Sequence, residues 1–132
     1  MEEQLSQRLI DQRIRNRIME AVETLADGDD GVRREWPDEY FESFYDVIPH
    51  RNRGGMYPNS AITADEKILL LALSHIVDVA CDATPNNMTA DELIATGWPQ
   101  RIQPIASKAL SLMRSRGRHR EDQEEDSPSI IL

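Results

Sequence analysis

The helical spacing of the apolar residues is the feature that most constrains the fold. Between Leu5 and Leu25, large apolar side chains return every three or four positions, which matches the 3.6-residue turn of an α-helix. The stretch from Ile68 to Ala80 is apolar on most of its faces and predicts a buried central helix. No stretch alternates apolar and polar residues for long enough to predict a strand. The sequence therefore predicts an all-α protein.

Local signals indicate where several helices begin and end. Gly28 is expected to end the first helix because glycine readily adopts the left-handed conformation found there, and the Gly-rich run around it indicates a loop. Thr63 and Glu66 have the spacing of a capping box, in which each side chain accepts a hydrogen bond from the other residue's main-chain N–H. Thr89 and Glu92 repeat this spacing and predict a short helix that follows them.

Prolines give the remaining boundaries. Pro37 suits the first turn of a second helix that ends before Pro49, and Pro99 suits the first turn of the last helix, which extends to Met113. Pro104 lies within this last helix and has no N–H to donate, so we expect a kink or a late restart there.

The chain after Gly117 is polar and has no apolar face that could join a core. Such a composition favours disorder, because too little apolar surface is available to offset the entropy of ordering. The predicted architecture is therefore a compact bundle of four to five helices over residues 1–116, followed by a disordered polar tail over residues 117–132.

Composition excludes several classes of protein. The 132 residues include a single cysteine, Cys81, which excludes an internal disulfide and a metal site made of cysteines. The net charge of −9 argues against binding to nucleic acid or to anionic membranes, since phosphate contacts require a basic face. No apolar run reaches the length of a membrane-spanning helix, and the acidic N-terminal residues do not resemble a secretion signal. We therefore expect a soluble cytoplasmic protein.

One segment is much more acidic than the rest. Between Met19 and Pro49, ten acidic residues accompany only Arg33 and Arg34, which gives this segment a net charge of −8. Such a surface attracts a basic protein partner and speeds its encounter, and aromatic residues within it can serve as anchors. The candidate partner-binding residues are Glu35, Trp36, Asp38, Glu39, Tyr40, Glu42, Tyr45 and Asp46.

The sequence contains no recognisable catalytic motif, and we assign no catalytic residue, metal ligand or cofactor. One enzymatic alternative stays open, because Glu39 with Glu42 and Asp78 with Asp82 have helical spacings that put two carboxylates on one face. If these four acids converged, they could bind a divalent metal in an all-α nucleotide hydrolase. A Cys–His nucleophilic pair is poorly supported, since His75 and Cys81 point to opposite sides of their helix.

A third alternative is self-association. The leucine-rich stretch that begins at Ile68 could pack against its own copy and make the chain a homodimeric adaptor. The apolar Ser-Ile-Ile-Leu end, residues 129–132, has no assigned role.

Scattered residues along the chain resemble the pattern of a family. They are Arg17, Met19, Ala21, Leu25, Asp27, Trp36, Tyr45, Asp46, Glu66, Trp98, Ala106 and Ala109. Together they resemble small acidic all-helical bacterial proteins that are immunity-like. The resemblance implies a protein that inhibits a toxin by binding, with an acidic surface that covers a basic site on the toxin. It brings no catalytic residues.

Overall fold

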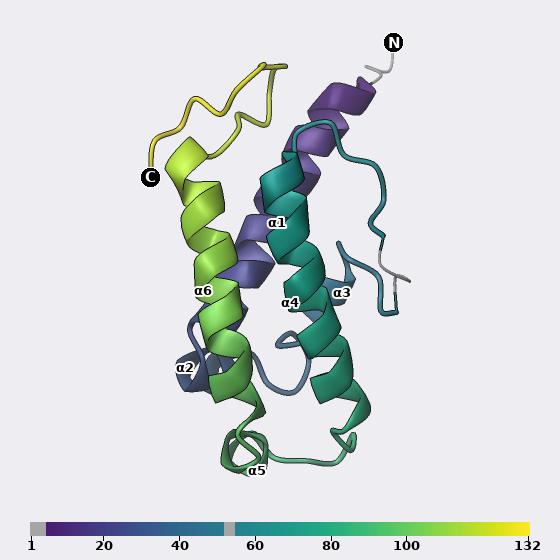
Figure 1. The fold of residues 1–132 in the computed structure, drawn as a ribbon, viewed down its shortest axis with the longest axis vertical. Helices are drawn as coiled ribbons and strands as arrows, with labels where there is room; N and C mark the ends of the chain where they lie inside the picture. The colour runs from purple at the N-terminus through teal and green to yellow at the C-terminus, as the bar shows by residue number, and fades with distance from the viewer. Residues whose placement is uncertain (1–4, 52–54) are drawn as a thin grey trace.

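The computed structural model describes residues 5–51 and 55–132, and over these residues the protein is an all-α bundle. Its helices are α1 (Gln7–Ala26), α2 (Asp29–Glu35), α3 (Glu42–Tyr45), α4 (Ala64–Asp82), α5 (Ala90–Ala95) and α6 (Trp98–Arg116). Helix α6 packs against both α1 and α4, and α2 lies against α1 and α5 (Figure 1). The described part of the chain thus has six helices where the sequence predicted four to five.

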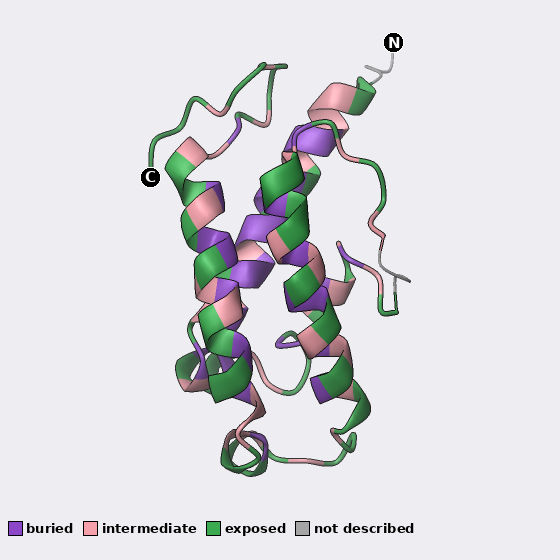
Figure 2. Ribbon diagram, viewed as in Figure 1, coloured by how far each residue is buried: buried purple, intermediate pink, exposed green. Residues whose placement is uncertain are grey.

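The core lies where the three long helices meet. Val22 and Leu25 from α1, Leu73 from α4, and Ile102 and Met113 from α6 are all buried. Burial of each such side chain contributes roughly 1.5–3 kcal/mol. Figure 2 shows that buried residues follow the inner faces of these helices and exposed residues follow the outer faces, as the helical period predicts.

Both predicted capping boxes are confirmed. The Thr63 hydroxyl accepts a bond from the Glu66 N–H at 3.2 Å, and the Glu66 carboxylate accepts one from the Thr63 N–H at 3.0 Å. Thr89 and Glu92 repeat this arrangement at the start of α5. Each box satisfies main-chain donors that the first turn of a helix leaves free.

The predicted loop after Gly28 is wrong, because residues Asp29–Glu35 form α2. Gly28 does end α1, but its positive φ of 58° turns the chain directly into the next helix. Gly31 lies inside α2, where a Cβ atom would come within 2.1 Å of the Thr24 carbonyl oxygen. This glycine is therefore a close-packing residue between α1 and α2, and it was mistaken for a turn residue.

The predicted helix from Pro37 to Pro49 is also wrong in extent. Only Glu42–Tyr45 forms a helix, α3, and turns occupy most of the remainder. Tyr40, Phe44 and Ile48 are nevertheless buried. A succession of turns buries these residues at the same spacing as a helix, so periodicity alone did not distinguish the two structures.

Helix α6 does not restart at Pro104. It runs without interruption from Trp98 to Arg116, and Pro104 lies on its exposed side. The expectation of a late restart was therefore wrong. On the exposed side of a helix, water can bond the main-chain carbonyl for which the proline offers no N–H.

The predicted disorder of the tail is contradicted. Residues between Gly117 and Asp126 bond to side chains in the N-terminal half of α1, and His119 is fully buried there. The Asn16 amide donates to the His119 carbonyl at 2.9 Å and accepts from its N–H at 3.3 Å. Arg118 and Ile130 form an antiparallel bridge that closes the tail on itself. The tail is ordered by polar contacts to α1, which a search for apolar faces cannot detect.

No helix in residues 5–51 and 55–132 combines the length and the apolar character that crossing a membrane requires.

Candidate functional site

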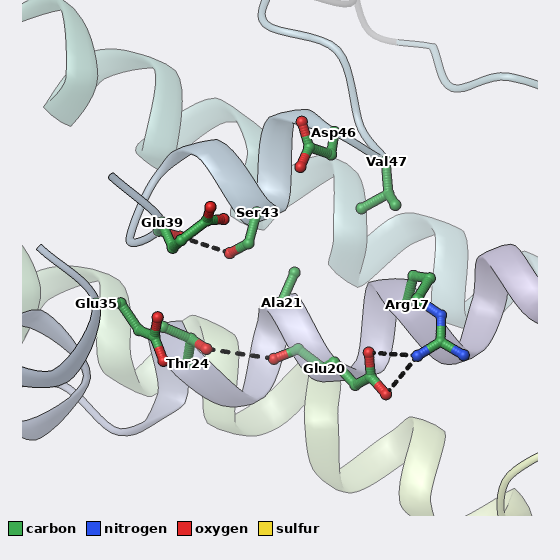
Figure 3. Close-up of a pocket in the computed structure, with 9 residues that line it drawn as sticks. All are labelled: Arg17, Glu20, Ala21, Thr24, Glu35, Glu39, Ser43, Asp46 and Val47. Atoms are coloured by element: carbon green, nitrogen blue, oxygen red, sulfur yellow. Dashed lines mark hydrogen bonds and ion pairs between the residues drawn. The ribbon is translucent and has the colours of Figure 1, made fainter. Parts of the chain in front are cut away.

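An acidic cleft lies between α1 and the segment that leads through α3 (Figure 3). Its volume is about 300 Å³. It is lined by Arg17, Glu20, Ala21, Thr24, Glu35, Glu39, Ser43, Asp46 and Val47. Figure 3 shows Glu39, Ser43, Asp46 and Val47 along one wall and the α1 residues along the other. The structure thus brings together Glu35, Glu39 and Asp46, three of the candidate partner-binding residues.

Charge in the cleft is unbalanced. Among the described residues that line it, Arg17 is the one cation, and both of its guanidinium NH₂ groups are already engaged, by Glu20 at 2.7 Å and by Glu121 in the tail. Glu35 pairs with Arg34 at 3.2 Å. Within the described residues, no cation lies at ion-pair distance from Glu39 or Asp46.

Ser43 fixes the backbone of one cleft wall. Its hydroxyl donates to the Glu39 carbonyl oxygen at 2.7 Å (Figure 3). Glu39 and Asp46 are both exposed, so their carboxylates remain hydrated and free to accept hydrogen bonds. This arrangement suits a lysine or arginine side chain, whose N–H groups make strong hydrogen bonds to carboxylates.

The predicted aromatic anchors contribute mainly to the protein's own interior. Tyr40 is fully buried, so it cannot contact a partner, and burial raises the pKa of its phenol. The half-buried Trp36 donates its indole N–H to the Met88 carbonyl at 2.8 Å. Tyr45, also half-buried, donates its hydroxyl to Asp78 at 2.9 Å, and burial followed by this bond raises its pKa.

The remaining candidates, Asp38 and Glu42, are exposed but do not line the cleft. Neither makes an ion pair with a described residue. Their role in binding stays a prediction.

The four acids of the enzymatic alternative have different surroundings. Asp82 is paired with His50 at 3.0 Å and with Arg51 at 3.1 Å, and Asp78 accepts the Arg51 N–H at 3.1 Å. Glu39 lies instead on the wall of the acidic cleft. Among the described residues, no group of three or more His, Cys, Asp or Glu side chains is arranged to hold a metal ion. The geometry therefore gives this alternative no support.

Cys81 is not placed as a nucleophile. Burial raises the pKa of its thiol, and the neighbouring carboxylate of Asp82 raises it further. A reactive cysteine requires the opposite, a lowered pKa in an electropositive setting.

Two charged residues that line the cleft were missed as site residues. Glu20 and Arg17 belong to α1, some twenty positions before the other acids of the cleft. Glu20 was counted within the acidic segment, but its place in the lining of the cleft depends on how α1 packs. This position is set by contacts between segments that are distant in sequence, and the local spacing of residues carries no information about such contacts.

Comparisons with known proteins found no matching family model, no matching curated protein and no matching solved structure. The resemblance to immunity-like proteins therefore depends on the sequence pattern alone.

Proposed function

We propose that this chain is a non-enzymatic protein-binding module that holds a basic partner at the acidic cleft. The observation that carries the proposal is the pair of exposed carboxylates, Glu39 and Asp46, which face the cleft with no cation at ion-pair distance among the described residues. Elsewhere the molecule pairs many of its charges internally, so unpaired carboxylates in a concave site favour a cation supplied from outside. Half-buried and exposed acids around the cleft would accelerate the encounter.

The specific form we propose is a cytoplasmic immunity protein that neutralises a bacterial toxin. Inhibition would follow from occlusion, since an acidic surface placed over a basic catalytic or nucleic-acid-binding site prevents access to it. The absence of a recognisable catalytic motif in the sequence and the high negative charge support this form.

The test is affinity capture from the source cells with three immobilised baits. They are the unchanged chain, a Glu39→Lys/Asp46→Lys variant, and an Asp91→Lys/Glu124→Lys variant that makes the same change in net charge at exposed positions outside the cleft. We expect one basic protein to be retained by the unchanged chain and the control, released by moderate salt, and lost from the cleft variant.

Equal capture by all three baits would contradict the proposal, because binding would then depend on general negative charge. Retention of no basic protein by the unchanged chain at low salt would also count against it.

Self-association is a second candidate, favoured by the outer face of α4. Ile68 is 65% exposed and Val79 is 43% exposed, and their spacing of eleven residues puts both on the same side of this helix, where a second copy could cover them. Sedimentation equilibrium distinguishes the candidates: a dimer that Ile68→Gln dissociates would support an adaptor, and a monomer at high concentration would exclude it.

A further inference from the structure

A second hollow, the apolar pocket, adjoins the acidic cleft. It lies between α1 and the chain that precedes α4, with Ile14, Ile18, Met56 and Ile62 among its lining residues, and its volume is about 260 Å³. Ile14 is 36% exposed at this site. The pocket thus presents apolar side chains to solvent beside a strongly acidic surface.

The two hollows share a wall. Asp46 and Val47 line both the acidic cleft and the apolar pocket. Figure 3 shows these two residues next to each other at one end of the cleft. A ligand that occupies the cleft therefore reaches the pocket by passing Asp46, so apolar and ionic contacts can be made by one continuous segment.

The size of the pocket indicates what fills it. A pocket of this volume lies below the roughly 300–1,000 Å³ of typical small-molecule sites. It is, however, large enough for one aliphatic side chain. Protein interfaces place their strongest contacts in this way, with an anchor side chain in a desolvated pocket and polar contacts around it.

The charge of a candidate partner decides whether it can occupy the acidic cleft and the apolar pocket. A second copy of this chain also carries a net charge of −9, and its approach to the acidic cleft would be opposed by like-charge repulsion. An anionic lipid surface would be repelled for the same reason. A cationic segment with one apolar residue is complementary to both hollows.

We infer that the partner binds through an arginine- or lysine-rich segment that inserts one aliphatic side chain into the apolar pocket while its cations occupy the acidic cleft. This inference rests on the proposed function and adds the chemistry of the partner. The cationic residues of the partner speed association and make binding sensitive to salt. The aliphatic residue makes binding specific and slows dissociation.

The test uses the full chain and a panel of ten-residue peptides. A single leucine is moved along an arginine- and glycine-containing sequence, and a reference peptide carries alanine instead. Binding is followed by NMR of the isoleucine and methionine methyl groups. We expect the best leucine peptide to bind about tenfold more tightly than the alanine peptide, from the apolar area buried. It should shift the methyl resonances of Ile14, Met56 and Ile62.

Matched variants separate the two contributions. Ile14→Gln should remove the preference for leucine, so that the leucine and alanine peptides bind this variant with similar affinity. Ile68→Gln, a similar change on the outer face of α4, should alter neither. Glu39→Lys should weaken all the peptides.

Three outcomes would overturn the inference. If leucine and alanine peptides bind equally, with shifts confined to the cleft, the anchor is wrong and the proposed function still stands. If leucine peptides shift Ile68 in place of Ile14, the anchor lies on another face. If no peptide binds, or Glu39→Lys binds as well as the unchanged chain, the inference and the proposed function both fail.

Discussion

Charged residues on the two sides of α1 have different surroundings. On the side that faces the tail and α4, Arg15 is fully buried and pairs with Glu66 at 2.7 Å, and Arg116 reaches the same carboxylate at 2.7 Å. On the side that faces α3, Glu39 and Asp46 are exposed and make no ion pair with a described residue. The buried charges of Arg15 and Glu66 are thus paired and hold α1 to α4, whereas the carboxylates of Glu39 and Asp46 are left without an ion pair to a described residue at a site that a partner can reach.

The matched side is a network. Besides Glu66, the Arg15 guanidinium donates to the Gly117 carbonyl at 2.8 Å and to the Met113 carbonyl at 3.0 Å. Gln12 donates to the Arg120 carbonyl at 3.1 Å and accepts from the Glu125 N–H at 2.8 Å. These side chains of α1 bind the main chain of the tail, so the order of the tail depends on them.

The largest expected effect comes from breaking the buried pair. Arg15→Met leaves the Glu66 carboxylate buried with one cation fewer, and we expect it to lower the free energy of unfolding by about 3 to 5 kcal/mol. Chemical denaturation measures this loss. Arg17→Met, which removes exposed ion pairs to Glu20 and Glu121, should cost about 1 kcal/mol or less. Equal losses of stability in the two variants would show that ion pairs on the two sides of α1 contribute equally to the fold.

The next effect concerns the tail. Asn16→Ala leaves the His119 main chain without its side-chain partners, and we expect a loss of about 1 to 3 kcal/mol together with faster hydrogen exchange over residues 118–130. Gln100→Ala, which removes an exposed bond to Asp29, provides the control and should leave exchange in the tail unchanged. Unaltered protection of the tail in Asn16→Ala would show that it is held by other contacts.

A smaller effect follows from pH. Burial, followed by the charge of Arg15 and then that of Arg8, lowers the pKa of His119 below its ordinary value of 6.5. As pH falls through 6.5, the unfolded chain takes up a proton that the folded chain excludes, so stability decreases until the lower folded pKa is reached. Denaturation midpoints between pH 8 and pH 5 measure this decrease, and His119→Gln should remove part of it. A midpoint that does not change between these pH values would contradict the lowered pKa of His119.

The effect of His119 on the pH dependence of stability can be separated from the effect of the carboxylates in the same network. Bonds from Asn16, Arg17 and Arg118 hold the pKa of Glu121 below its ordinary value of 4.5, despite the opposing effect of burial. Its contribution to stability is present above pH 4.5 and is lost as pH falls through the lowered folded value. Loss of stability between pH 8 and pH 5 therefore reports on His119, and further loss in stronger acid reports on carboxylates.

The smallest effect is expected in the cleft. Glu39→Gln/Asp46→Asn removes two charges that have no described partner, so the free energy of unfolding should change by less than about 0.5 kcal/mol. The same denaturation experiment measures it. A loss above about 1 kcal/mol would mean that these carboxylates stabilise the fold, and it would count against the proposed function.

The elements that the sequence predicted well are those governed by local chemistry. The period of α1 and α4 and the two capping boxes follow from residues within a turn or two of each other. The errors occurred where distant contacts decide the outcome. Gly31 lies in α2 at a point where the Thr24 carbonyl oxygen leaves no room for a side chain, and α1 presents polar side chains to the main chain of the tail.

The candidate site was predicted in the same partial way. Sequence position placed Glu35, Glu39 and Asp46 in one acidic segment, and the structure places all three around one cleft. The spacing did not show that Tyr40 points into the core, since aromatic residues suit an interior as well as an interface. Nor did it reveal the apolar pocket, which forms only when the chain before α4 returns to α1.

The most direct test of the central claim is an NMR titration of the full chain with an arginine-rich peptide, at low and at high salt. We predict amide shifts centred on Glu35, Glu39 and Asp46 that diminish as salt is raised, because the interaction is between charges at the surface. Shifts spread evenly over the exposed acids, or centred on the tail at Glu124 and Asp126, would contradict the claim that the cleft is the binding site.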